Sequence, residues 1–443
     1  MISRREFISL SAAAGAVATL PSFAQASNAK VVIIGGGVGG ATVAKYLKKK
    51  APNTQVILIE QNPVYIRPYG SSEVLTGHID MSDLEVNYDA LHYKYGVEIV
   101  IDRAIGLDAD KRRVKTASGA AYNYDRLVVS PGIELQYDRI DGYSRDIAET
   151  KAPSGWIPGS QTSLLRDQIQ NMRQGGTMLI VAPPNPYRCP PGPYERGALV
   201  AEWMQKHNPT GKVIIADPKN EFTTGKNMRL AWNRRYGYNI PESYKNGMPN
   251  DVIDHKTPGM IDWITGDNGG KAISLDAKNM TLTTESEKIK ADVINIVPPM
   301  RAGKIAQTFG LTNEAGWCSV SRTTFESQKV PFVHVLGDAA IADDMPKSGY
   351  AANTQAKVAA YAIANLLAGR PVELDLTWEN TCFALGASDY GFFVTACYKL
   401  KNGRITKRKA PALQSLDADE ATLRLSAIYQ QAWMKSFTED CFA

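Results

Sequence analysis

The sequence predicts an α/β protein with two Rossmann-like dinucleotide-binding-type domains and a small α+β domain at its C-terminus. Three observations lead to this fold class: a glycine-rich loop between two apolar segments near residue 35, a second apolar segment at 177–182, and an aromatic-rich stretch beyond residue 373. The length of 443 residues agrees, since domains average roughly 150 residues.

Composition excludes several classes of protein. Apolar residues make up 44% and charged residues 21%, which is enough for a sizeable core. A net charge of +5 over this length does not indicate nucleic-acid binding. Five cysteines are too few for a disulfide scaffold, and no Cys or His spacing indicates a metal site. We expect no transmembrane segment in the mature chain.

The first 26 residues are typical of an export signal. Arg4 and Arg5 precede a largely apolar run, and Phe23–Ala26 is typical of a cleavage site. The arginine pair favours twin-arginine export, with cleavage after Ala26 and delivery to the periplasm. The alternative is an ordinary secretion signal in which the arginine pair is accidental.

Residues 30–60 carry the first nucleotide-binding pattern. An apolar strand at 30–34 leads into a G-x-G-x-x-G loop and a helix, and a second strand at 55–59 ends at Glu60. In this context the loop binds a pyrophosphate at the helix N-terminus, and the acid accepts from a ribose hydroxyl. The candidate cofactor contacts are Gly35, Gly37, Val38, Gly39, Gly40, Glu60 and Gln61.

Two further segments distinguish FAD from NAD. The strand at 333–336 ends in Gly337 and Asp338, and a helix begins near Gly349 and Tyr350. They resemble the second flavin fingerprint of two-dinucleotide-fold flavoproteins, and 124–132, which ends in Pro131 and Gly132, resembles the strand where the chain leaves their FAD domain. The resemblance implies an FAD domain at 27–140 and 300–371, a second domain at 141–299 and a C-terminal interface domain at 372–443.

The second domain departs from the nicotinamide-binding pattern. Its strand at 177–182 runs into a proline-rich turn at 183–193 instead of a glycine loop, so we expect no NAD site. Cys189 lies in that turn near Arg188 and Arg196, where cations and a helix N-terminus would favour a thiolate. Glu195 is placed to move a proton there. Its alternative is a solvated helix carboxylate.

These residues resemble a known family. Arg188–Arg196, Pro298–Ala306, Gly316–Cys318, Met345–Tyr350 and Asn380–Cys382 are similar to segments of the flavoprotein subunit of flavocytochrome c sulfide dehydrogenase, whose fold is disulfide-reductase-like. The resemblance implies that Cys189 and Cys382 form a redox-active disulfide beside FAD, with Glu195 as proton acceptor. Arg301 joins the candidate cofactor contacts. Pro68 stands where the family often has a flavin-linking cysteine, so we expect FAD to be held noncovalently.

The implied function is periplasmic, FAD-dependent oxidation of sulfide to sulfur or polysulfide, with electron transfer to a c-type cytochrome subunit. Two alternatives are an enzyme similar to sulfide:quinone reductase and a Sox-system flavoprotein partner without independent turnover. The last helix, near 423–437, places several apolar side chains at helical spacing, and we expect this face to pack in the core; the alternative is a membrane face. They are Leu425, Ile428, Tyr429, Ala432, Trp433 and Phe437.

Overall fold

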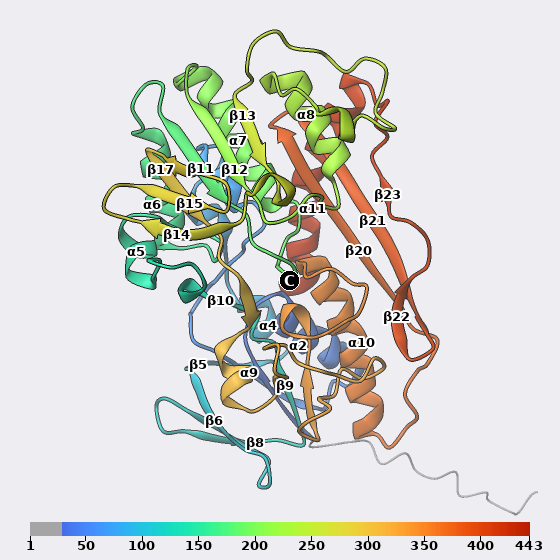
Figure 1. Cartoon of the computed structure of the whole chain (residues 1–443). Helices are drawn as coiled ribbons and strands as arrows, with labels where there is room; N and C mark the ends of the chain where they lie inside the picture. Colours follow the sequence, from blue (N-terminus) through green and yellow to red (C-terminus); the bar gives the residue numbers. More distant parts are fainter. Residues whose placement is uncertain (1–28) are drawn as a thin grey trace, which may run out of the picture.

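The computed structural model describes residues 29–443, so the expected export signal and its cleavage site lie outside the described residues. The chain forms two α/β modules joined by a long C-terminal hairpin and helix (Figure 1). This arrangement matches the predicted fold class.

The first module is built on a five-stranded parallel sheet in the order β19-β9-β1-β2-β5. Its central strand β1 (Lys30–Ile34) pairs with β2 (Gln55–Glu60) and β9 (Arg126–Val129), and β5 (Glu98–Ile101) and β19 (Val333–Val335) lie at the edges. Helices α2 (Val38–Lys50) and α10 (Gly349–Leu367) pack against each other. The central strands are apolar because they are buried on both faces. β19 thus brings the region of Asp338 to the sheet that carries the glycine loop.

Smaller elements complete this module. A three-stranded antiparallel sheet accompanies the parallel sheet, with strands β6 (Ala104–Asp108), β7 (Arg113–Thr116) and β8 (Ala121–Asn123). There are also two two-stranded pairs, β3 (Tyr65–Ile66) with β4 (Glu85–Val86) and β10 (Ile133–Leu135) with β18 (Met300–Ala302). The short helices of the module are α3 (Ser71–Leu75), α4 (Asp89–Tyr93) and α9 (Lys304–Thr308).

The second module repeats the α/β pattern. Its parallel sheet has the order β13-β12-β11-β17, with α7 (Gly192–His207) connecting β11 to β12. The strands of this sheet are β11 (Thr177–Val181), β12 (Lys212–Ala216), β13 (Ile261–Ile264) and β17 (Val293–Ile296). The module also contains three further helices, α5 (Arg145–Thr150), α6 (Ser160–Gln170) and α8 (Gly225–Tyr236). A small antiparallel sheet completes it, with strands β14 (Ala272–Asp276), β15 (Thr281–Thr284) and β16 (Lys288–Lys290). The turn before α7 carries Cys189.

The C-terminal module joins the other two. Strands β20 (Thr377–Ala387) and β21 (Tyr390–Lys401) form a long hairpin, extended by β22 (Arg404–Lys407) and β23 (Ala412–Leu413). β20 packs against α7 and α10, and the final helix α11 (Glu420–Phe442) packs against β21 and α2. Among the described residues, no helix has the length and apolar character needed to cross a membrane.

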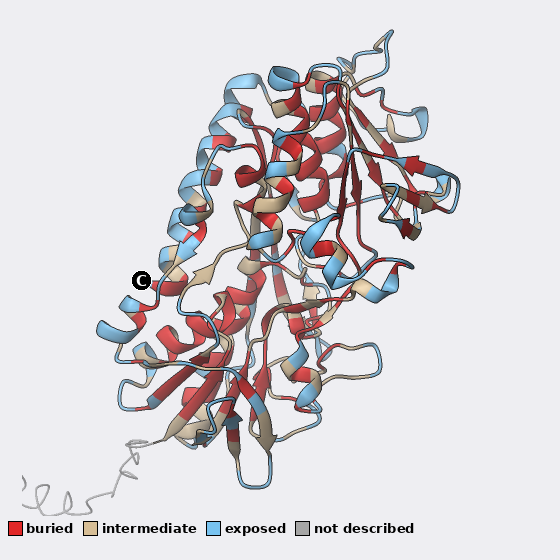
Figure 2. Ribbon diagram, turned by 90° about the vertical axis from the view of Figure 1, so that its left-hand side faces the viewer, coloured by how far each residue is buried: buried red, intermediate tan, exposed pale blue. Residues whose placement is uncertain are grey.

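The expected core face of α11 is confirmed for Phe437, which is 5% exposed, and wrong for the N-terminal half of the helix. Leu425, Ile428 and Tyr429 are 44%, 59% and 53% exposed, and Figure 2 shows the outer side of this helix in the colour of exposed residues. The inner side instead buries polar groups that have partners: Ser426 donates to Gln414, and Gln430 donates to Glu73. Apolar spacing therefore identified the buried side only toward the C-terminal end of the helix.

Candidate active site

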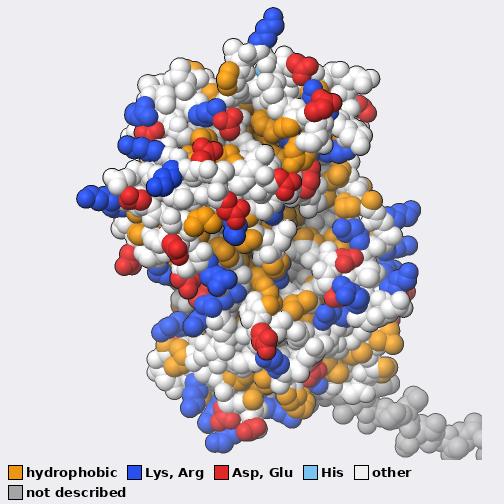
Figure 3. Space-filling model, in the orientation of Figure 1, with side chains coloured by type: hydrophobic (Ala, Val, Ile, Leu, Met, Phe, Trp, Pro, Cys, Tyr) orange, Lys and Arg blue, Asp and Glu red, His pale blue; other side chains and the backbone are white. Residues whose placement is uncertain are grey.

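A cavity of about 1550 Å³ lies where the three modules meet. Figure 3 shows a hollow on this face, with Lys and Arg side chains gathered over β22 at its margin. Most of the predicted site residues line the cavity: Gly35, Gly37, Val38, Gly39, Glu60, Gln61, Pro131, Gly132, Cys189, Glu195, Gly337, Asp338, Gly349, Tyr350 and Cys382. The fold thus brings together residues that are up to 350 positions apart in the sequence.

One end of the cavity suits a diphosphate. Gly35 has φ +96°, and a Cβ there would lie 2.4 Å from the Ser130 carbonyl oxygen. Helix α2 begins with Gly37 as its N-cap, and its first turn has neither a capping side chain nor an acidic residue. Its N-terminal N–H groups can therefore face a bound anion.

Two predicted residues do not line the cavity. A Cβ on Gly40 would lie 1.9 Å from the Gly35 carbonyl oxygen, so this glycine permits the close contact between α2 and the loop. Arg301 donates from Nε to Glu134 at 2.9 Å, and it is Glu134 that lines the cavity. Both residues support the cavity wall from behind.

Glu60 stands at the end of β2, beside the glycine loop. Its carboxylate accepts from the Gly36 N–H at 2.7 Å and from the Asn62 N–H at 3.0 Å. These bonds hold the carboxylate at the cavity, in the position where a ribose hydroxyl is bound in dinucleotide folds.

The other end of the cavity lies between Asp338 and the start of α10. Burial raises the pKa of the Asp338 carboxyl, while the nearby Arg188 and Lys347 act in the opposite direction. Ser348 caps α10 by accepting from the Ala351 N–H. Pro68 also lines the cavity, and residues 65–74 contain no cysteine. In size, in its cradle of glycines and in its two helix N-termini the cavity fits FAD.

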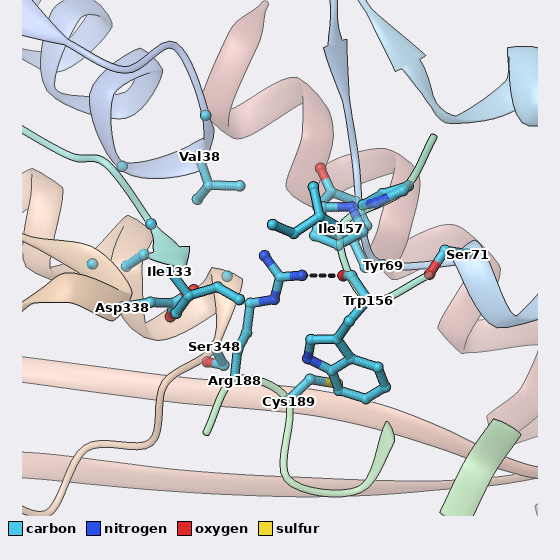
Figure 4. Close-up of a pocket in the computed structure, with 18 of the residues that line it drawn as sticks. Val38, Tyr69, Ser71, Ile133, Trp156, Ile157, Arg188, Cys189, Asp338 and Ser348 are labelled. Atoms are coloured by element: carbon cyan, nitrogen blue, oxygen red, sulfur yellow. Dashed lines mark hydrogen bonds between the residues drawn. The ribbon is translucent and has the colours of Figure 1, made fainter. Parts of the chain in front are cut away.

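The proline-rich turn presents Cys189 to the cavity. Cys189 has φ +59°, and its N–H donates to the Lys347 carbonyl at 2.9 Å. Its own carbonyl accepts from the Gly192 N–H at 3.0 Å. A Cβ on Gly192 would lie 2.5 Å from Cη2 of Trp156 and 3.2 Å from the Cys189 sulfur, so the indole, the thiol and the turn are packed together. Figure 4 shows Cys189 below the Trp156 ring.

The expected preference for thiolate at Cys189, whose side chain is exposed to the cavity, is opposed by the groups around the thiol. Burial raises the pKa of this thiol to about 12, with Glu195, Cys382 and Asp338 adding to the rise and Arg188 opposing it. The prolines of the turn have no N–H to offer. The N–H groups of Gly192, Tyr194 and Glu195 are already used within the turn. The expected helix N-terminus therefore provides no free donor at the sulfur.

Cys382 reaches the same cavity from β20. It lies opposite Val394 in the hairpin, and its sulfur is 3.7 Å from the Asn380 side-chain oxygen. Burial raises the pKa of the Cys382 thiol to about 11, while Asn380 and Ser348 act in the opposite direction. All five cysteines, each within the described residues, are free thiols in this structure, so it contains no disulfide between Cys189 and Cys382.

Glu195 lies in the first turn of α7 and faces both thiols. Its Oε1 accepts from the Leu385 N–H of β20 at 2.9 Å. Burial raises the pKa of the Glu195 carboxyl to about 8, with Glu73 adding to the rise and the Leu385 N–H and Arg196 opposing it. It is therefore a buried carboxylate that can take up a proton near neutral pH, in place of a solvated one.

Several residues of the site were not found from the sequence. Trp156 and the aromatic group Tyr69, Trp433 and Phe437 line the cavity. Trp433 and Phe437 stack with ring centres 5.2 Å apart, and Phe437 also stacks on Tyr350. No local motif marks Trp156, whereas α11 was set aside as core packing.

The position of a nicotinamide nucleotide in the second module is filled by protein. Asp217, directly after β12, accepts from the Tyr194 hydroxyl at 2.5 Å, from the Trp263 indole and from Lys219. Tyr194 stacks on Phe222 with ring centres 3.5 Å apart. An acid at this strand end would otherwise be placed to bind a ribose. Here it is saturated by side chains.

Family models match three parts of the chain. Residues 162–298 match "Sulfide dehydrogenase [flavocytochrome c] flavoprotein chain, central", and 375–442 match "Flavocytochrome c sulphide dehydrogenase, flavin-binding". Residues 29–153 match "Pyridine nucleotide-disulphide oxidoreductase". The sulfide dehydrogenase flavoprotein chain of Chlorobaculum thiosulfatiphilum is 46% identical over 37 residues, which are 8% of this chain and 77% of that relative. This chain belongs to the flavocytochrome c sulfide dehydrogenase flavoprotein family. The predicted resemblance is thereby confirmed.

Other relatives share parts of the sequence or only the fold. The sulfide-quinone reductase of Aquifex aeolicus (strain VF5) is 32% identical over 89 residues, which span about a fifth of each protein. The structure of a sulfide:quinone oxidoreductase from Aquifex aeolicus aligns with a TM-score of 0.68 over 93% of this chain and 92% of that one, at 18% identity. An NAD-dependent persulfide reductase from A. fulgidus aligns with a TM-score of 0.57 at 13% identity, over 91% of this chain and 77% of that one. These two structures show that this chain shares their fold.

Proposed function

We propose that the protein is an FAD-dependent sulfide dehydrogenase that passes electrons to a c-type cytochrome subunit in the periplasm. The observation that carries the proposal is the meeting of Cys189, Cys382 and Glu195 in one cavity that fits FAD. The family supports the same chemistry. In the proposed enzyme FAD is held noncovalently along the glycine loop, Glu60 and Asp338, and when bound it supplies the ability to accept an electron pair and release single electrons.

The chain's own residues perform the sulfur chemistry. In the oxidised protein Cys189 and Cys382 are joined, and hydrosulfide attacks one of the two sulfurs. A new S–S bond forms as the cysteine–cysteine bond breaks, which leaves a persulfide on one cysteine and a thiolate on the other. Glu195 takes up the proton that the attacking sulfur carries when its carboxyl is ionised, and the ionised fraction grows as the pH rises toward its pKa of about 8.

The test is reconstitution with sulfide and a c-type cytochrome. The holoprotein isolated from its native periplasm should co-purify with a haem subunit, and haem reduction should follow addition of sulfide. Isolation without a haem subunit, together with reduction of quinone but not of cytochrome, would contradict the proposal.

A second candidate is a sulfide:quinone reductase-like activity. The observation that favours it is the exposed apolar stripe of Leu425, Ile428 and Tyr429 on α11, which is suited to contact with an apolar surface. Fractionation separates the two: release without detergent favours the cytochrome-linked enzyme, whereas retention in the membrane pellet favours the quinone reductase. If neither cytochrome nor quinone supports sulfide oxidation, the third expectation remains, a Sox-system flavoprotein partner without independent turnover.

A further inference from the structure

The sulfur chemistry proposed above needs anions at Cys189, but the turn offers no backbone donor to hold them. Pro190, Pro191 and Pro193 lack an N–H, and the N–H groups between and after them bond within the turn. Burial meanwhile raises the pKa of the Cys189 thiol. An anion at this position therefore has to be held by side chains.

Trp156 provides an unused donor in the right place. Its side chain is only 6% exposed, and its Nε1–H has no hydrogen-bond partner in the structure. A buried N–H without a partner is costly, and most buried polar groups are satisfied. The ring lines the cavity and approaches the same point above Gly192 as the Cys189 sulfur. In Figure 4 the indole nitrogen lies on the side of the ring that faces Arg188 and Cys189.

The indole is held firmly by the residues behind it. Arg196 is 1% exposed, and its guanidinium donates to the carbonyls of Ser154 at 2.9 Å and Gly155 at 3.0 Å. Its guanidinium carbon also lies 5.0 Å from the centre of the Trp156 ring. These contacts fix the segment that carries the indole, so that its N–H keeps its direction without a ligand.

Arg188 adds a positive charge to the same space. Its guanidinium donates to the Trp156 carbonyl and extends into the middle of the cavity, between Asp338 and Trp156 (Figure 4). The groups that face Cys189 are thus Arg188 from its own turn, Arg196 and Glu195 from α7, Cys382 from β20 and Asp338 beyond β19. Arg188 and Arg196 are the two cations among these five, and Arg196 already donates to the carbonyls of Ser154 and Gly155.

We propose that the Trp156 indole N–H and the Arg188 guanidinium form an anion-binding site that holds a small sulfur anion, such as hydrosulfide, beside the Cys189 sulfur. The identity of the anion rests on the proposed function; the existence of the site does not. A neutral N–H donor and one guanidinium suit a small monoanion better than a divalent one, because a single guanidinium balances a single negative charge.

The experiment compares two alkylating reagents on the reduced holoprotein. Iodoacetate is an anion and iodoacetamide is its neutral analogue, and both form a carbon–sulfur bond at Cys189 with loss of iodide. The ratio of their rates, followed by mass spectrometry of the peptide that contains Cys189, reports attraction of an anion and cancels any change in the reactivity of the thiol. Loss of one hydrogen bond to an anion should lower this ratio about tenfold in Trp156→Phe.

Trp378→Phe is the matched control. Trp378 is also buried with an unpartnered Nε1–H, but it does not line the cavity, so its variant should keep the ratio of the unchanged protein. If Trp156→Phe does not fold, Arg188→Gln decides, because it leaves the indole in place and should likewise lower the ratio. An unchanged ratio in Trp156→Phe, or in Arg188→Gln where it replaces that variant, would overturn the proposal.

The same measurement separates this inference from the proposed function. It uses neither sulfide nor an electron acceptor. If the ratio falls in the variants but the unchanged protein oxidises no sulfide, the anion site stands and the proposed function is refuted. If the ratio is unchanged in the variants but the protein oxidises sulfide, only the anion site is refuted.

Discussion

At the scale of single residues, Glu195 gives the site its sharpest pH dependence. Its carboxylate must be ionised to take up a proton, so sulfide-dependent turnover should rise as the pH increases through about 8. In Glu195→Gln the rise of turnover with pH should disappear, and the rate should fall about 100-fold, within the usual range for loss of a general base. The ionisation of sulfide affects both pH profiles equally, so its contribution cancels when the profile of Glu195→Gln is compared with that of the unchanged protein.

Glu202→Gln is the matched control for this prediction. Glu202 lies on the same helix, where its carboxylate accepts from the Ser388 N–H and hydroxyl at the hairpin turn, away from the cavity. Its variant should keep the pH profile of the unchanged enzyme. Equal profiles for Glu195→Gln and the unchanged protein would remove Glu195 from the mechanism.

Glu195 also affects stability. Its folded pKa of about 8 lies above the ordinary 4.5, so the folded protein binds more protons than the unfolded chain between these values. The free energy of unfolding should therefore fall as the pH rises from about 4.5 to 8. Glu195→Gln should show a shallower fall, measured by denaturant titration at several pH values. A steeper fall in the variant would contradict the sign of this pKa shift.

Substitution of a cysteine of the site should have a different effect from substitution of another cysteine. Cys382→Ser should retain flavin and lose sulfide-dependent flavin reduction, because the partner of Cys189 is gone. Cys397→Ser, in the same hairpin but with an exposed side chain, is the control and should behave as the unchanged protein. Undiminished reduction in Cys382→Ser would point to a different pair, with Cys397 the first to examine. Absorbance spectra during sulfide titration provide the measurement.

Sequence patterns located the residues that act through the backbone or through a motif. The glycine loop, Glu60, Asp338 and the Cys189 turn follow from local spacing, and the cavity contains all four. Trp156 could not be found in this way, because its role depends on contacts with Arg196 and Gly192 that are 40 and 36 residues away. The thiol pKa was misjudged because the sequence does not show which N–H groups are already bonded.

At the scale of elements, the contact between α2 and the glycine loop leaves no space for a side chain at residue 40. Gly40→Ala would place a methyl group 1.9 Å from the Gly35 carbonyl oxygen, which is backbone and cannot move aside. We expect a loss of about 2 kcal/mol or more in the free energy of unfolding, and weaker retention of flavin. Gly106→Ala, which meets only a Lys115 side-chain carbon at 3.9 Å, is the control for thermal unfolding measurements. Equal stability of the two variants would contradict this account.

The filled nucleotide position in the second module predicts that NADH is not a substrate. Asp217 is saturated by Tyr194, Trp263 and Lys219, and the Tyr194–Phe222 stack lies directly beside it. NADH should leave the flavin absorbance unchanged under anaerobic conditions in which sulfide bleaches it. Rapid bleaching by NADH would show that these side chains move to admit a nucleotide.

The elements themselves were largely predictable because the parallel strands are short apolar runs bounded by glycine, proline or acid. β1, β2, β11, β12 and β19 all follow this rule. α11 did not, since its buried side carries Ser426 and Gln430, whose partners come from outside the helix. A pattern of apolar residues predicts the buried side of a helix only where no other element supplies hydrogen-bond partners that allow its polar residues to be buried instead.

At the scale of the whole molecule, the attachment of the cofactor is testable without any substrate. Pro68 lines the cavity, and no thiol occurs in residues 65–74. Acid precipitation should therefore release the yellow colour into the supernatant. Colour that stays with the pellet would refute noncovalent binding, and mass spectrometry of the precipitated protein provides an independent check.

The last helix sets the order in which the protein can be assembled. Gln430, Trp433, Met434 and Phe437 form part of the cavity wall, and Lys45 of α2 donates to the carbonyls of Glu439 and Asp440 near the end of the chain. While a ribosome still shields these residues, the pocket lacks one side. The cavity can therefore enclose a bound cofactor only after α11 has been synthesised and has packed against the rest of the protein.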